Sequence, residues 1–296
     1  MRGGGYWVVR TLRSGKVIEK SQFYVGERRP RAPRKKGSTT LERKDKNMNT
    51  AVRRLARIIN CNWGRGDLWL SLKYDNEHLP ACPEEADKCM DLAWRRLRRA
   101  LDAAGVQLRG FWMTADKDPE TREEERLHHH AVISMEGVTV RWDEDGQLAE
   151  CSINGRELAD IWGMGSIHVE PLREQDDYTP IAVYCIRQAV DAPDAKKWHA
   201  TRGLKKPVVE SERVVDRARE LRAPGGAVVS EVSHYDGGSG THYIRYIRKP
   251  RAPKVGGHKE RALWEAGEDN SSVTCGDSSL CTREPLGGED VGGGVQ

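Results

Sequence analysis

Residues 126–134 read RLHHHAVIS, where three of the chain's nine histidines are consecutive and precede a short apolar run. The apolar, β-branched run favours a β-strand. Successive side chains of a strand point to opposite faces, so His128 and His130 should share one face and His129 should take the other. Two imidazoles about 6–7 Å apart along a strand can bind one metal ion. The alternative is that the histidines are solvated at a hairpin end.

The segments around this strand indicate an α+β fold. The alternating LWLSLKY at 68–74 predicts a strand, and the amphipathic stretch 83–105 predicts a helix that opens with Pro83 and closes with Gly105. Further patterns predict a helix from residue 49, strands at 108–116, 128–135 and 166–172, a hairpin over 138–153, and helices at 155–163 and 179–190. This order predicts a ferredoxin-like or RRM-like antiparallel sheet with helices packed on it.

Charge and composition divide the chain into four predicted regions. Residues 1–75 contain 19 lysines and arginines against 6 acidic residues, although the net charge of the whole chain is only +4. A basic start attached to an acidic body favours a polyanionic partner. The predicted regions are a basic arm, a folded domain, an extension with a helix and a hairpin, and a disordered tail, at 1–48, 49–207, 208–250 and 251–296.

No stretch is apolar for the length of a membrane span, and no apolar segment follows the start of the chain. The seven cysteines form no CxxC pair, which favours a reducing compartment. The sequence therefore predicts a cytoplasmic protein without a membrane partner, in a host cell that we expect to be bacterial.

Two acidic residues near the histidines are candidate metal ligands. Asp116 ends the predicted strand before the histidine strand, and a hairpin would bring it beside them. Two histidines and one carboxylate suit Mg²⁺ or Mn²⁺ with open positions for a phosphate. Asp118 is a rival ligand, and Asp116 can equally be a turn-forming residue.

Two tyrosines compete for the role of nucleophile. On the predicted helix 179–190, Tyr184, Arg187 and Gln188 lie at positions i, i+3 and i+4 and form a polar face. Tyr178 precedes the predicted N-cap Thr179 and is explained by packing at the start of the helix. Tyr184 is therefore the candidate nucleophile, although a structural tyrosine with a wet hydroxyl is also possible there.

Three motifs in order resemble those of rolling-circle replication initiators, the Rep proteins of phages, plasmids and small circular DNA viruses in the HUH endonuclease superfamily. GDLWLSLKYDNEHLP (66–80) is similar to the first motif, LHHHAVIS (127–134) to the His-x-His metal motif, and AVYCIRQA (182–189) to the Tyr-x-x-Lys motif. The resemblance covers roughly 49–207. His129, Arg187 and Asp116 depart from the usual hydrophobic residue, lysine and glutamate of the family.

The resemblance implies a metal-dependent endonuclease and strand transferase that acts on single-stranded origin DNA. Tyr184 would form a 5′-phosphotyrosine and leave a 3′-OH primer for a host polymerase, assisted by a helicase. His128, His130 and Asp116 would hold Mg²⁺ or Mn²⁺, and Arg187 would assist at the phosphate. Basic residues of the first predicted helix would contact the DNA backbone, namely Arg53, Arg54 and Arg57.

Two other functions remain compatible with the sequence. A relaxase or single-tyrosine transposase would use the same chemistry, although relaxases often place the tyrosine before the histidine motif. A non-catalytic RRM-like protein that binds single-stranded nucleic acid would explain the basic charge and the fold. It would leave the histidine pair and Tyr184 without a role.

Overall fold

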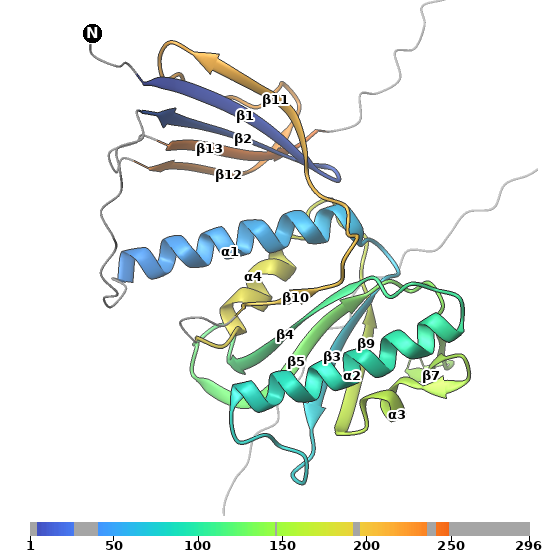
Figure 1. Ribbon diagram of the computed structural model, residues 1–296. Coiled ribbons are helices and arrows are strands. Elements are labelled where there is room, and N and C mark those ends of the chain that lie inside the picture. The colour runs from blue at the N-terminus through green and yellow to red at the C-terminus, as the bar shows by residue number, and fades with distance from the viewer. Residues whose placement is uncertain (1–4, 27–40, 146, 192–195, 236–240, 249–296) are drawn as a thin grey trace, which may run out of the picture. The chain divides into compact units, whose positions relative to one another are not determined.

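A computed structural model shows a mixed α+β fold with three sheets, in which all neighbouring strands are antiparallel (Figure 1). The α+β prediction is therefore confirmed at this level. The structure describes residues 5–26, 41–145, 147–191, 196–235 and 241–248.

The central sheet carries the histidine strand. Its strand order is β10-β4-β5-β3-β9, which puts β5 in the middle, hydrogen-bonded to β4 and β3. The strands are β3 (Leu68–Tyr74), β4 (Gly110–Lys117), β5 (Glu124–Ile133), β9 (Gly165–Pro171) and β10 (His199–Ala200). The four longer strands lie where the sequence predicts them, with ends that differ by a few residues.

Helices cover both faces of the central sheet because both faces are apolar. One face packs its leucines against α2 (Pro83–Ala103) and the short α3 (Leu158–Trp162). The other packs Phe111, Met113 and Val132 against α1 (Leu41–Asn62) and α4 (Thr179–Gln188). Full burial of each such side chain contributes about 1.5–3 kcal/mol, so this two-sided core fixes which strand face each residue takes.

A small three-stranded sheet follows β5 in the chain. It consists of β6 (Thr139–Trp142), β7 (Leu148–Ile153) and β8 (Arg156–Glu157), in that order. Asn154 and Gly155 join β7 to β8 with positive φ angles of 50° and 74°. Asn-Gly is the pair that such a two-residue hairpin turn favours, so the turn is encoded locally.

The N-terminal segment differs from the predicted basic arm. Residues 6–25 form the hairpin of β1 (Tyr6–Ser14) and β2 (Val17–Val25), and α1 begins at Leu41 rather than at residue 49. The prediction of an extended arm over 1–48 is wrong for these residues. Their β-branched and aromatic side chains lie on both sides of a Gly15-Lys16 turn, a strand signal that the high cation count obscures.

The strand partners of this hairpin come from the far end of the chain. The sheet order is β11-β1-β2-β13-β12, with β11 (Val208–Val215), β12 (Val228–Tyr235) and β13 (Thr241–Ile247). The predicted hairpin over 226–248 corresponds to β12 and β13, but the helix predicted after residue 208 is wrong. Val208, Val209, Val214 and Val215 give this charged segment a strand preference, and β1 supplies its partner.

Some predictions fall on residues that the structure does not describe. They concern most of the basic segment 25–40, the turn 236–240 and the tail 251–296. Across the part of the chain that is described, no helix combines the length and apolar character needed to cross a bilayer.

A buried ionic network joins α1 to the N-terminal sheet. The Glu19 carboxylate, which is 4% exposed, accepts two hydrogen bonds from the Arg57 guanidinium at 2.6 and 3.2 Å. The Tyr243 hydroxyl donates a third at 2.5 Å. A carboxylate buried this deeply is stable only because all three donors meet it.

We expect Glu19→Ala to lower the free energy of unfolding by about 3 kcal/mol, because it leaves the Arg57 charge half-buried without its partner. The matched control is Glu212→Ala, which removes an exposed ion pair to Arg10 and should cost less than about 1 kcal/mol. Urea unfolding measures both. Equal losses would contradict the buried network.

Candidate active site

The three histidines of β5 divide between the two faces of the central sheet. His129 is fully buried on the α2 side, where its Nε2 lies 2.6 Å from the Tyr74 hydroxyl and its Nδ1 lies 3.1 Å from Thr114 Oγ1. Burial lowers the pKa of His129 to about 3, so it is neutral. His129 is therefore a hydrogen-bonded core residue, as expected from its side of the strand.

His128 and His130 lie together on the opposite face, with their Nε2 atoms 3.2 Å apart. The Nδ1 atoms have other partners: the Arg126 carbonyl at 2.9 Å from His128 and Ser71 Oγ at 3.1 Å from His130. The carbonyl can only accept, so the proton of a neutral His128 lies on Nδ1 and its Nε2 lone pair faces His130 Nε2. Partners that orient the distal nitrogen in this way are typical of metal-binding histidines.

The electrostatic surroundings keep His130 neutral. Burial is the largest effect and lowers the pKa of His130 to about 3, with a further lowering from the neighbouring His128. A neutral imidazole is the form that ligates a cation. His130 therefore presents a neutral imidazole to the space in front of it.

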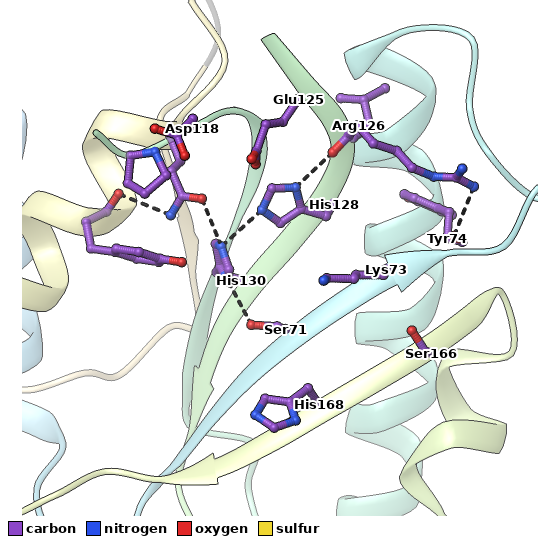
Figure 2. A pocket seen from close by; sticks show the side chains of 14 residues that line it. Ser71, Lys73, Tyr74, Asp118, Glu125, Arg126, His128, His130, Ser166 and His168 are labelled. Carbon is purple, nitrogen blue, oxygen red and sulfur yellow. Dashed lines mark hydrogen bonds between the residues drawn. The ribbon is translucent and has the colours of Figure 1, made fainter. Parts of the chain in front are cut away.

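That space is a surface pocket of about 800 Å³ in front of the histidine pair (Figure 2). It is built by strand register, because β3 sets Ser71 opposite His130 and Lys73 opposite His128, and β9 sets His168 and Ser166 beside them. Side chains that are cross-strand neighbours share a face, so three strands contribute one polar patch. The remaining walls come from the loop after β4, the start of β5 and α4, with Tyr74, Asp118, Pro119, Glu125, Arg126, Leu127, Tyr184 and Gln188.

Tyr184 reaches this pocket from α4. Its ring centroid lies 5.4 Å from that of His130 and 5.8 Å from that of Trp69, and its side chain is 41% exposed. Burial raises the pKa of Tyr184, and the carboxylates of Glu125 and Asp118 raise it further. The phenol is therefore protonated at neutral pH and accessible from the pocket.

The rival Tyr178 has a structural role. It is 5% exposed within the core beneath α4, and its hydroxyl donates to the Arg173 carbonyl at 3.0 Å. It is also the N-cap residue, so the predicted cap Thr179 is instead the first residue of α4. Asp177 accepts from the Thr179 backbone N–H at 2.8 Å and fixes the start of the helix that carries Tyr184.

The predicted ligand Asp116 does not line the pocket. A register irregularity between Ala115 and Lys117 interrupts the pairing of β4 with β5 at this residue. Burial raises the pKa of Asp116, whose charged neighbours include Lys117 and Lys197 and whose Oδ1 is buried without a hydrogen bond. The carboxylates that line the pocket are instead those of Asp118, the rival in the sequence, and Glu125.

The predicted arginines are also engaged elsewhere. Arg187 lies outside the pocket lining and donates to the Glu120 carbonyl at 2.8 Å, which holds the loop after β4. Arg53 donates to Glu231 at 2.5 Å and lies over the Tyr243 ring, and Arg57 pairs with Glu19. Of the three predicted DNA contacts on α1, Arg54 is the one with an exposed side chain and no such partner among the described residues.

The pocket contains side chains of the types that bind divalent metal ions, namely two histidines and two carboxylates. In the described part of the chain, no three His, Cys, Asp or Glu side chains are grouped closely enough to form a metal centre. Two converging Nε2 atoms with oriented distal nitrogens fit half of one, and Asp118 and Glu125 supply carboxylates on the same pocket. The histidine pair thus offers two ligands of such a site, and the described residues group no carboxylate closely enough with the pair to complete it.

The structure adds Lys73 to the candidate residues and places Gln188, from the predicted polar face, in the pocket lining. Lys73 points toward the histidine pair from β3, and Gln188 Oε1 lies 3.4 Å from His130 Nε2 (Figure 2). The sequence contains a signal for Lys73, because Trp69, Ser71 and Lys73 alternate with the leucines of LWLSLKY and must share a face. Gln188 lies one turn after Tyr184, the same signal that singled out Arg187.

No protein-family model, curated protein or solved structure matches the chain.

Proposed function

We propose that the chain is a replication initiator of the HUH endonuclease type, which nicks single-stranded origin DNA through Tyr184. The observation that carries the proposal is the meeting of the His128–His130 pair with Tyr184 in one pocket. The pair comes from β5 and the tyrosine from α4, so the meeting depends on the tertiary fold. A ferredoxin-like arrangement of the central sheet, with the site on its face, belongs to the same proposal.

The proposed reaction is a transesterification at phosphorus. Tyr184 Oη attacks the scissile phosphate, the P–O3′ bond breaks, and a 5′-phosphotyrosine and a free 3′-OH result. The phenol proton passes to a base, for which the pocket lining offers the carboxylates of Asp118 and Glu125. The departing O3′ takes a proton from solvent. The ester bond is exchanged rather than hydrolysed, so the reverse reaction can rejoin the strand.

Charges along the pocket suit a phosphate. His128 and His130, with Asp118 or Glu125 in place of the predicted Asp116, would hold Mg²⁺ or Mn²⁺, which would neutralise charge on the phosphate oxygens. The Lys73 ammonium adds a protein cation on the same face of β3. Arg126 is anchored by backbone carbonyls of Tyr74 and Asp75 at 3.1 and 2.7 Å, and so shapes the pocket wall.

In this proposal the 3′-OH primes a host polymerase, and a helicase separates the strands ahead of it. Such a protein acts in the cytoplasm of the cell that carries the replicon. The proposal extends to the class of reaction and to single-stranded DNA as substrate.

The test is the formation of a denaturation-resistant protein–DNA adduct. The full chain is incubated with Mn²⁺ and a pool of random-sequence single-stranded oligonucleotides that carry a fluorophore at the 3′ end. A 5′-phosphotyrosine retains the 3′ part of the strand, so we expect a labelled protein band on a denaturing gel. EDTA should remove the band, and a pool labelled at the 5′ end should give none. Tight binding without any adduct would instead support the non-catalytic nucleic-acid-binding protein.

A further inference from the structure

A second pocket lies on the α2 side of the central sheet. It has a volume of about 400 Å³ and lies between α2 and the β7–β8 turn. Its lining residues are Arg96, Arg99, Ala100, Ile153, Asn154 and Arg156. Three of these six side chains are guanidinium cations, and none is acidic.

The cations of this pocket are not neutralised within the described chain. Arg99 donates to the Arg95 carbonyl at 3.4 Å and Arg156 to the Asp160 carbonyl at 3.2 Å, which orients the guanidinium groups without cancelling their charge. None of the three arginines forms an ion pair with a described acidic side chain, whereas the nearby Arg141 pairs with Glu150. Like charges around one pocket repel each other, and an anion bound between them removes this electrostatic repulsion.

Local structure holds the three arginines in place. Arg96 and Arg99 are three residues apart on α2 and therefore lie on one side of the helix. The Asn154-Gly155 turn leads directly into β8. The first residue of β8, Arg156, lines the pocket together with residues of α2. Ile153 is buried beneath them, so the pocket floor is fixed by the core.

This pocket is separate from the site of Tyr184. Leu68, Leu70 and Leu72 of β3 pack in the same core as the buried residues of α2, whereas Ser71 and Lys73 line the Tyr184 pocket. Neighbouring residues of a strand point to opposite faces, so the two pockets lie on opposite sides of the central sheet. One phosphate cannot contact both.

We propose that this arginine pocket binds the phosphodiester backbone of a nucleic acid, at phosphates other than the one that Tyr184 would attack. Guanidinium groups match phosphate oxygens with paired N–H donors, and Asn154 adds an amide donor. This inference rests on the proposed function, in which the chain handles single-stranded DNA, so a backbone phosphate of that polymer is the anion that the pocket would meet. A polymer also releases counterions when it binds, which a single small anion does not.

The experiment compares two variants with the same loss of charge. Arg96→Gln/Arg99→Gln alters the pocket, and Arg95→Gln/Arg98→Gln alters the neighbouring side of the same helix. Glutamine preserves the helix in both. Binding of fluorescein-labelled 30-nucleotide single strands and 30-base-pair duplexes is measured by anisotropy from 50 to 200 mM NaCl, in EDTA so that no cleavage occurs.

We expect the pocket variant to weaken binding about 10-fold at 100 mM NaCl and to reduce the slope of log K against log [NaCl] by about 1.5. The neighbouring variant should weaken binding less than about 3-fold. Equal losses of affinity in the two variants would show a general effect of charge and contradict the pocket as the binding site. Unchanged binding in the pocket variant would also contradict the proposal.

A second arm separates nucleic acid from free phosphate. If 10 mM inorganic phosphate raises the melting temperature of the wild-type chain but not of the pocket variant, while oligonucleotide affinities are equal, the site is one for a small anion and the proposal fails. Arg156→Gln, in the hairpin, repeats the test should the α2 variant unfold. Adduct formation at Tyr184 is scored independently, so loss of nicking and loss of backbone binding are distinguishable outcomes.

Discussion

Tyr184→Phe is expected to abolish the covalent protein–DNA adduct, with a loss of at least about 10⁴-fold in nicking rate, because it removes the attacking oxygen. The ring remains and can keep its edge contacts to His130 and Trp69, so the pocket should retain its shape. Affinity for single-stranded DNA should change less than about 5-fold, since one hydroxyl contributes about 1 kcal/mol or less to binding. Adduct yield on denaturing gels and anisotropy in EDTA measure the two quantities.

Tyr178→Phe is the matched control. It also removes one phenolic oxygen from the start of α4, but this oxygen donates to the Arg173 carbonyl in the core. The variant should lose about 1 kcal/mol of stability and keep its nicking activity. Nicking that persists in Tyr184→Phe and disappears in Tyr178→Phe would reverse the assignment of the nucleophile.

The double variant His128→Ala/His130→Ala is expected to weaken Mn²⁺ binding by about 100-fold or more and to remove metal-dependent nicking. Both converging Nε2 ligands are lost, and the remaining carboxylates bind such ions weakly on their own. Isothermal titration with Mn²⁺ alone gives the affinity without reliance on DNA cleavage. Circular dichroism checks that the two truncations leave the fold intact.

His168→Ala is the control for the loss of Mn²⁺ affinity. His168 lines the same pocket, but its side chain is exposed and its Nε2 lies 2.8 Å from Glu170. Its loss should leave the Mn²⁺ affinity within about 3-fold of the wild type, because it supplies no converging ligand. An unaltered Mn²⁺ affinity in the double variant would contradict the assignment of the pair as ligands.

Local sequence patterns predicted the parts of the site that depend on a single element. Alternation along β5 placed His128 and His130 on one face and His129 on the other. Helical spacing and the Thr179-Pro180 pair located α4 and distinguished the exposed Tyr184 from the buried Tyr178. These inferences succeeded because strand and helix periodicity follow from backbone geometry alone.

The parts that depend on long-range pairing were not predictable in this way. Asp116 was expected beside the histidines from simple hairpin geometry, but the irregular register at the end of β4 carries Asp118 and Glu125 to the pocket instead. A shift of one residue in the strand register moves a side chain to the other face of the sheet, and no local sequence pattern predicts such a shift.

The partners of the α1 arginines also depend on long-range pairing and were not predictable from local sequence. These partners, Glu19 and Glu231, lie on β2 and β12, strands that come from opposite ends of the chain. Read locally, the basic charge of the first 75 residues favoured a DNA-binding arm. In the structure, part of that charge is neutralised within the protein, by Glu19 and Glu231.

The most direct measurement of the central claim is the identification of the residue that carries DNA after the reaction. The wild-type chain is incubated with Mn²⁺ and single-stranded oligonucleotides, the adduct is digested with nuclease and protease, and peptides are sequenced by mass spectrometry. The account predicts a nucleotide attached through its 5′ phosphate to Tyr184. A nucleotide on Tyr178, on any other residue, or on no peptide would contradict it.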